Sequence, residues 1–392
     1  DVYKRQYADI GTRLQDGLFR VELRGAGGPQ GLTAGLDVGL AGQWLPRGIT
    51  PLPMQGVWWL PDGRALVGSV APRSAAELAG LRPGAEIVEV NGESIGRYVG
   101  RAAQYSNRPT EVGRRHDALK LMAYDREAMV LKVRQDGKDQ TFDLRQRVAE
   151  RPQAAGSAPN NESLSAFQLR SQSGRQYGYI ALNSFADGGG NLDQWERSLA
   201  AATQARLSGL VLDLRGANHG AYQLVPHYAA SFFSYDRPLR LQGYAQRQVD
   251  ATAKVWRTRG SLGLPPQLPL FTQGGAYYGA SLVLLTGPEC TGPCEMFAAW
   301  LQKAGRAQVI GTEPTPGAVG MTTRVLLPGD VIVHAPTVAE LGAKGDHYVF
   351  GKGVEPDLRL AADAGFVQRV MTGGDPVLDA AVQWLDGRPL AR

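Results

Sequence analysis

The sequence lacks any apolar run close to the roughly 18 residues that a membrane-spanning helix needs. We therefore expect no transmembrane segment. The chain has only two cysteines and five histidines among 392 residues, so we also expect no metal site. The basic residues outnumber the acidic ones by five. They are scattered rather than gathered with aromatic residues, which argues against nucleic-acid binding. We also expect no cofactor.

The two cysteines, Cys290 and Cys294, lie four residues apart at the start of an expected helix. This spacing can bring the two Cα atoms to about 6 Å, so it suits a local disulfide. A pair of buried thiols is the other interpretation, and both are favoured over a metal. The chain begins at Asp1 rather than at a methionine, so we expect any signal peptide to lie outside this sequence.

Composition and hydrophobic pattern divide the chain into four parts. Residues 1–45 form an entry segment with one expected helix, and residues 46–150 contain short strands joined by Asp-Gly and Asn-Gly turns, as in a mostly-β domain. Residues 151–166 are rich in Pro, Ala, Ser and Asn and predict a linker. Strands and helices alternate in residues 167–392, which predicts an α/β domain with a mostly parallel sheet.

One strand–turn–helix–strand unit in that last part has the pattern of an active-site segment. The apolar run 281–285 ends at a Thr-Gly-Pro turn, an amphipathic helix follows from Glu295, and a second apolar run covers 308–310. The turn lies at the carboxyl end of a strand, where α/β sheets place ligands and chemistry. We therefore expect the functional site there.

Several segments resemble the C-terminal processing (tail-specific) and tricorn-type serine peptidases. The run CTGPCE resembles their Ser-Ala-Cys-Glu turn, with Glu295 setting the register. The segments ALVGSVAPRSAAELAGLRPGAEIVEVNGESI, QYGYIALNSF, LVLDLRGANHGA, GKGVEPDLRL and GGDPVLDAAVQWL resemble the family's PDZ domain, core strands, glycine loop, closing strand and last helix. The resemblance implies a crotonase-like α/β core with an inserted mostly-β PDZ domain, and a serine-type endopeptidase ancestry.

The positions that match the family's catalytic residues carry other side chains. The nucleophile position is Gly292, the histidine position is Leu18 and the glutamate position is Phe350. Pro293 follows the nucleophile position and has no N–H for an oxyanion. The family's alternative lysine would fall in residues 314–320, which contain none. The resemblance therefore predicts that both catalytic sets of the family are missing.

Other residues near the turn provide fallback candidates. Thr291 has a hydroxyl one position from the nucleophile, and His219 lies in the glycine loop that borders the oxyanion hole in relatives. Gly220 in that loop and Pro293 mark the oxyanion region. A turn threonine and a loop histidine without catalytic roles are the simpler interpretation of the pair.

The PDZ-like part suggests peptide capture. PDZ domains add a peptide strand to a sheet edge and hold its terminal carboxylate with backbone N–H groups. The expected peptide-binding residues are Gly56, Val57, Trp58 and Leu60, although Trp58 also suits simple packing on one strand face. The expected partners are unfolded or C-terminal peptide segments of other proteins.

These observations leave three functions open. The first is an inactive or impaired peptidase relative that binds extended or C-terminal peptides. The others are an active serine endopeptidase with a non-standard site, and an adaptor that acts through its PDZ domain. Because relatives often act outside the cytoplasm and a disulfide persists in oxidising compartments, we expect a periplasmic or secreted location.

Overall fold

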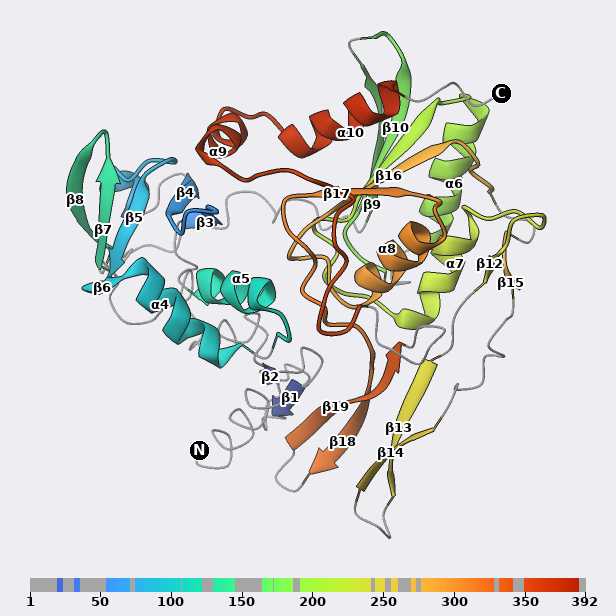
Figure 1. Ribbon diagram of the computed structural model, residues 1–392, viewed down its shortest axis with the longest axis horizontal. Coiled ribbons are helices and arrows are strands. Elements are labelled where there is room, and N and C mark those ends of the chain that lie inside the picture. Colours follow the sequence, from blue (N-terminus) through green and yellow to red (C-terminus); the bar gives the residue numbers. More distant parts are fainter. Residues whose placement is uncertain are drawn as a thin grey trace. The chain divides into compact units, whose positions relative to one another are not determined.

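The computed structural model describes most of the chain, in two compact units (Figure 1). The described residues are 20–23, 32–35, 54–70, 75–106, 108–121, 130–144, 164–171, 173–185, 191–240, 244–250, 255–259, 269–272, 276–327, 331–340 and 349–387. Unit 1 comprises Asp1–Asn161, Arg324–His334 and Ala361–Pro376, and unit 2 comprises Glu162–Thr323, Ala335–Leu360 and Val377–Arg392. The domain boundaries inferred from composition stay predictions.

Unit 2 is built on a six-stranded sheet in the order β20-β17-β16-β11-β10-β9. Its strands are β9 (Leu164–Arg170), β10 (Gln176–Leu182), β11 (Gly209–Asp213), β16 (Ser281–Thr286), β17 (Gln308–Gly311) and β20 (Leu358–Arg359). All neighbouring pairs are parallel except β9 with β10. The prediction of an α/β domain with a mostly parallel sheet is confirmed.

The central strands explain why the sheet forms. Every residue of β11 is buried, as are the last five residues of β16, because helices cover both faces of a parallel sheet and the strands read as continuous apolar runs. The parallel register pairs Leu210 with Leu282 and Leu212 with Leu284. The carboxyl ends of β11 and β16 therefore meet at one edge, where the expected site begins.

The helices of unit 2 are α6 (Asn191–Gln204), α7 (Val225–Ala230), α8 (Pro293–Lys303) and α10 (Pro376–Asp386, in this unit from Val377), with a 3₁₀ turn over Tyr222–Leu224. Helices α7 and α8 lie side by side (Figure 1). Four buried aromatic rings pack edge-on in pairs: Trp195 of α6, Tyr228 of α7, Phe232 just after α7, and Phe297 of α8. This cluster fixes α8 against the rest of the unit.

Further strands lie outside this sheet. Strand β12 (Leu239–Arg240) pairs with β15 (Pro269–Leu270), and β13 (Tyr244–Asp250) pairs with β14 (Val255–Arg259), both antiparallel. The strands β18 (Met321–Leu327) and β19 (Val331–Glu340) follow α8 and β17 in sequence. In unit 1, β1 (Arg20–Leu23) pairs with β2 (Leu32–Gly35).

The second sheet of unit 1 has the order β3-β4-β5-β7-β8, with β6 paired to β5. Its strands are β3 (Met54–Trp59), β4 (Ala65–Val70), β5 (Glu86–Val90), β6 (Glu93–Ser94), β7 (Val130–Gln135) and β8 (Lys138–Asp143). Its helices are α3 (Ala75–Leu78), α4 (Ile95–Ala102), α5 (Glu111–Leu121) and α9 (Ala364–Met371), with a 3₁₀ turn over Ala103–Tyr105. Among the described residues of both units, no helix is both long and apolar enough to span a bilayer.

The predicted turns of this sheet are present. Asn91 and Gly92 both have positive φ, and so do Asp136 and Gly137. Two successive residues with positive φ form the type I′ geometry that suits a two-residue hairpin. The Asn-Gly and Asp-Gly pairs therefore set the register of the β5–β6 and β7–β8 hairpins.

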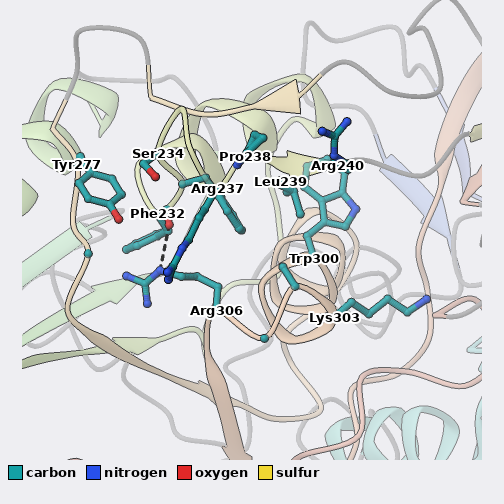
Figure 2. A pocket seen from close by; sticks show the side chains of 14 residues that line it. Phe232, Ser234, Arg237, Pro238, Leu239, Arg240, Tyr277, Trp300, Lys303 and Arg306 are labelled. Carbon is teal, nitrogen blue, oxygen red and sulfur yellow. Dashed lines mark hydrogen bonds between the residues drawn. The ribbon is translucent and has the colours of Figure 1, made fainter. Parts of the chain in front are cut away.

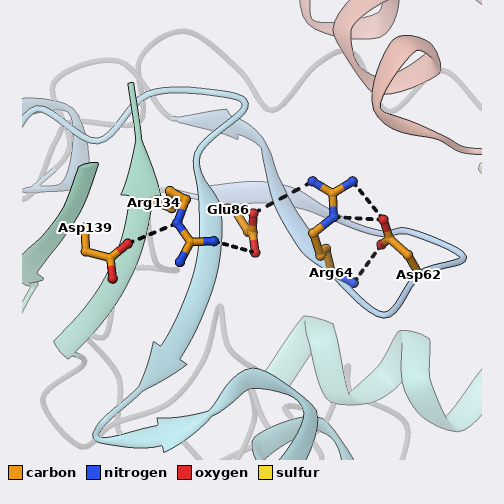
Figure 3. Close-up of polar contacts among 5 residues, drawn as sticks. All are labelled: Asp62, Arg64, Glu86, Arg134 and Asp139. Carbon is orange, nitrogen blue, oxygen red and sulfur yellow. Dashed lines mark hydrogen bonds and ion pairs between the residues drawn. The ribbon is translucent and has the colours of Figure 1, made fainter. Parts of the chain in front are cut away.

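A chain of charged side chains crosses the exposed face of the same sheet (Figure 3). Arg64 contacts Asp62 at 2.8 Å and Glu86 at 3.8 Å, and Arg134 contacts Glu86 at 3.8 Å and Asp139 at 3.1 Å. The hydrogen bond from Arg64 lowers the pKa of the Asp62 carboxyl. Exposed ion pairs contribute little stability each, so these contacts add little to the stability of the sheet.

Candidate active site

Helix α8 begins at a sharp turn after the central strand β16. The N-cap residue Gly292 has φ +60° and ψ −113°, a left-handed conformation that costs a residue with a Cβ about 1–3 kcal/mol. Pro293 occupies the first helical position, where its fixed φ suits a helix and its missing N–H leaves no donor unsatisfied. The predicted strand–turn–helix is confirmed, and the Gly-Pro pair shapes its bend.

The carboxylate of Glu295 holds this turn in place. It is fully buried and accepts hydrogen bonds from the N–H of Gly292 at 3.1 Å, the hydroxyl of Thr315 at 2.6 Å, and the N–H groups of Gly317 at 2.6 Å and Ala318 at 2.8 Å. A buried carboxylate without partners is costly, and here four donors surround it. We call this arrangement the Glu295 clasp; it ties the helix start to the loop after β17.

The space beside Gly292 is occupied by a tyrosine. A Cβ added at Gly292 would lie 3.0 Å from the hydroxyl oxygen of Tyr222 and 3.6 Å from its Cζ. The same hydroxyl accepts a hydrogen bond of 2.9 Å from the N–H of Gly320. A side chain at the N-cap would therefore crowd an oxygen that is already fixed in position.

The backbone donors at the turn are already used. The N–H of Gly292 points to Glu295, the N–H of Thr291 donates to the Ala217 carbonyl at 3.2 Å, and Pro293 has none. Gly220 is exposed with φ +143°, and a Cβ there would collide with the backbone of Phe185. Within the described part of the chain the Gly220 N–H makes no hydrogen bond, so one expected oxyanion donor stays accessible.

The two fallback candidates each make a hydrogen bond to Asn218. Thr291 is 7% exposed, and its hydroxyl donates to the Asn218 carbonyl at 3.2 Å. The Nδ1 atom of His219 lies 2.9 Å from the Asn218 side-chain oxygen. No hydrogen bond joins Thr291 to His219 among the residues that the structure describes. In this geometry the threonine hydroxyl stabilises the turn, and a catalytic role for the pair stays a prediction.

The two cysteines form a disulfide across the turn, with Cα atoms 5.3 Å apart and both residues fully buried. Of the two interpretations of the spacing, the disulfide is the one present. Neither sulfur is a thiolate nucleophile in this state. No group of three potential metal ligands occurs in the described ranges.

Comparison with known proteins matches two segments of the chain to domain families. The profile of peptidase family S41 matches residues 176–360, and the profile of the PDZ domain matches residues 66–106. The chain contains a peptidase family S41 domain. It is 25% identical over 299 residues to the carboxy-terminal processing protease CtpB of Bacillus subtilis (strain 168), which covers 76% of this chain and 53% of that protein. The chain thus spans about half the length of this curated relative.

Solved structures share the fold. The structure of mature CPAF complexed with lactacystin superimposes with a TM-score of 0.68 at 14% identity, covering 97% of this chain and 88% of that one. A crystal structure of mature CPAF gives a TM-score of 0.66 at 14% identity, with coverages of 98% and 88%. At this identity the likeness concerns the fold alone.

The resemblance matched three further places in the chain to catalytic residues of relatives: Leu18, Phe350 and the loop 314–320. Leu18 lies outside the described residues. Phe350 is partly exposed and directly precedes a turn at Gly351–Gly353, which packs against the backbone of Thr315. The loop 314–320, where the resemblance places a lysine in relatives, is held by the Glu295 clasp instead.

One polar cluster of the S41 domain was not singled out from the sequence. Asp213 ends β11 and accepts hydrogen bonds from the Arg215 side chain at 2.9 Å and from the Tyr179 hydroxyl at 2.7 Å. Burial raises the pKa of Asp213, but the hydrogen bonds and charge of Arg215 and the Tyr179 bond outweigh it, so the net pKa is lowered. Burial also raises the pKa of Tyr179. The Asp-Leu-Arg motif therefore anchors the glycine loop through an internal ion pair.

The expected peptide-binding residues lie in unit 1 on or just after β3. Val57 and Trp58 are partly exposed, whereas Leu60 is 1% exposed and belongs to the core. The Trp58 ring packs edge-on against Phe366 of α9, with centroids 5.5 Å apart. Gly56 lies in β3, and only its backbone is described. Peptide binding by these residues stays a prediction, and Trp58 also has the packing role that the sequence allowed.

Proposed function

We propose that this S41 chain is a catalytically inactive homologue that binds extended or C-terminal peptide segments without cleaving them. The observation that carries the proposal is the nucleophile position. Gly292 has no side chain, the Tyr222 oxygen occupies the adjacent space, and at the turn itself the N–H groups of Thr291 and Gly292 are already donated while Pro293 has none. Acyl transfer needs a nucleophile, a base and an oxyanion site together, and this turn lacks the first and weakens the last.

Further observations support related features of the proposal. The parallel sheet of unit 2 and the likeness to mature CPAF support a crotonase-like core. The matched PDZ segment supports a peptide partner. The Cys290–Cys294 disulfide supports an oxidising compartment, periplasmic or extracellular. We also retain a PDZ domain over 46–150, a linker over 151–166 and a core over 167–392 as proposed boundaries.

The test is cleavage of an unfolded protein, read by mass spectrometry, by the chain as it stands and by restored variants. The first variant combines Leu18→His, Gly292→Ser, Pro293→Ala and Phe350→Glu, and the second adds Tyr222→Phe. The matched control carries Gly292→Ala in place of Gly292→Ser. We expect no cleavage by the natural chain or the control, and cleavage by a restored variant.

Three results would change the conclusion. Cleavage by the natural chain would establish the alternative of an active endopeptidase with a non-standard site, and Thr291→Val and His219→Ala would then identify the residues. A folded but inert restored variant would contradict the register set by Glu295. Peptide binding by the whole chain that is lost on Val57→Glu but not on changes near Gly292 would favour the PDZ adaptor.

A further inference from the structure

A cavity of about 480 Å³ lies at the carboxyl end of α8, far along the helix from the nucleophile turn. Its walls come from the segment after α7, strand β12, the segment before β16 and the last turn of α8, all within unit 2 (Figure 2). The volume falls in the range of sites that hold small organic ligands. Neither the proposed function nor the S41 catalytic positions use this cavity.

The charged residues that line the cavity are all basic. They are Arg237, Arg240, Lys303 and Arg306, and the lining contains no aspartate or glutamate. Figure 2 shows these four basic side chains among the residues that line the cavity. Within the described part of the chain, the guanidinium groups of Arg237 and Arg240 make no ion pair. A concave surface lined by one sign of charge concentrates its field and raises the local concentration of counter-ions.

Arg306 adds a fixed positive charge at the base of the cavity. Its Nε donates to the Phe232 carbonyl at 3.0 Å, its Nη2 donates to the Tyr278 carbonyl at 2.6 Å, and its guanidinium lies over the Phe232 ring. Burial lowers the pKa of this guanidinium, because little solvent reaches its charge. Its described partners are neutral carbonyls and a ring, so an anion nearby would stabilise it.

The other walls are apolar. Phe232, Phe233, Leu239 and Trp300 line the cavity and are between 1% and 7% exposed, so their positions are fixed by the core. Such a surface favours an aliphatic or aromatic group by the area it removes from water. The cavity therefore combines cationic groups with an apolar wall.

We propose that this cavity binds a carboxylate attached to an apolar body. Arginine recognises carboxylates through paired N–H donors, and the apolar wall receives the rest of the molecule. A polyphosphate fits less well because the helix end at the cavity is the carboxyl end of α8, whose carbonyls repel a strongly negative group. Two sources supply this chemistry: the C-terminus of a peptide that ends in an apolar residue, and a free aromatic acid.

The first measurement uses the full chain and isothermal titration calorimetry with four probes. They are 3-phenylpropionate, a hexapeptide ending in phenylalanine with a free carboxylate, the same peptide with an amidated C-terminus, and inorganic phosphate. We expect the amide and phosphate to bind at least about tenfold more weakly than the free peptide, because a charge-assisted hydrogen bond is lost or the apolar contact is missing. Equal binding of acid and amide would overturn the proposal.

The two carboxylate probes distinguish the sources. A peptide that binds at least tenfold more tightly than 3-phenylpropionate identifies a chain terminus as the ligand, because further residues then add contacts. Equal affinities identify a small aromatic acid. Failure of both probes to bind contradicts the proposal, whether or not the S41 domain is catalytically active.

Variants assign the site, since a PDZ domain can also hold a terminal carboxylate. The double variant Arg237→Gln with Arg240→Gln removes two exposed cations from the cavity, and Arg197→Gln removes an exposed cation from α6 as the matched control. We expect the double variant to weaken 3-phenylpropionate binding at least about tenfold and the control to leave it within twofold. Unchanged carboxylate-dependent binding in the double variant would place the ligand elsewhere and overturn the proposal.

Discussion

The two ends of helix α8 use their polar groups in opposite ways. At the amino end, the Glu295 carboxylate is buried and satisfied by four donors from the protein itself. At the carboxyl end, four basic side chains line a cavity that contains no acidic residue. The amino end is therefore closed by internal bonds, whereas at the carboxyl end two of the lining cations, Arg237 and Arg240, make no ion pair with the described residues.

The substitution Glu295→Ala should have the largest effect, and it tests whether the Glu295 clasp stabilises the amino end of α8. The change leaves three backbone N–H groups and the Thr315 hydroxyl buried without an acceptor. At about 1–3 kcal/mol for each unsatisfied group, and with partial relaxation, we expect a loss of at least about 4 kcal/mol in the free energy of unfolding. Urea denaturation measures it.

The control for that loss is Glu196→Ala, which removes an exposed carboxylate from α6 and should change stability by less than about 0.5 kcal/mol. If Glu295→Ala costs no more than this control, the clasp does not hold the turn. The contrast between the two helix ends would then disappear.

A second test fills the position beside Tyr222. We expect Gly292→Ala to destabilise the chain by about 2–3 kcal/mol, because the φ of +60° strains an L-residue and the new Cβ meets the Tyr222 oxygen at 3.0 Å. Combining it with Tyr222→Phe removes that oxygen. In a double-mutant cycle, the two changes should cost less together than the sum of their separate effects. Additive effects would mean that Tyr222 does not restrict the nucleophile position.

The disulfide gives a third test at the same end. Replacing both Cys290 and Cys294 with alanine opens a very short loop, so the chain-entropy estimate is a loss of about 2 kcal/mol. Reduction by dithiothreitol should lower the urea midpoint of the natural chain and leave that of the double alanine variant unchanged. An equal response of both proteins to the reductant would exclude a stabilising role for this bond.

The smallest expected effect concerns pH. The pKa of Asp213 in the folded chain is lowered from its ordinary value of 3.8, so its ion pair with Arg215 stabilises the fold above that value. This contribution is lost as the pH falls from 3.8 through the lowered pKa. The variant Asp213→Asn should therefore show a flatter decline of unfolding free energy below about pH 4 than the natural chain. If the unfolding free energies of the two proteins declined in parallel, the pKa of Asp213 would be the same in the folded and unfolded states.

The sequence predicted best those features that depend on residues close together in the chain. The Asn-Gly and Asp-Gly hairpins, the buried strands and the start of α8 depend on neighbours in the chain, and their patterns predicted them. The helix expected from Glu295 begins two residues earlier, at Pro293, with Gly292 as its N-cap. The cysteine spacing allowed a disulfide and did not decide between that and free thiols.

The features that no pattern predicted depend on tertiary packing. Tyr222 lies 70 residues before Gly292 in sequence, and nothing local indicates that its hydroxyl fills the space beside that glycine. The cavity at the carboxyl end of α8 gathers arginines from two separate segments, 237–240 and 306, and each arginine considered alone is typical of a solvated surface charge. Ring packing of Trp58 on Phe366 likewise joins strand and helix across the length of the chain.

The Glu295 clasp also has a consequence for motion. Gly317 and Ala318 lie in an irregular loop, where amide hydrogens usually exchange rapidly with solvent through local opening. Opening this loop alone would strip a buried carboxylate of three of its four donors, so the loop can open only together with the start of α8. The amides of Gly317 and Ala318 should exchange deuterium as slowly as those of the central strands, and this short connection then behaves as part of the core.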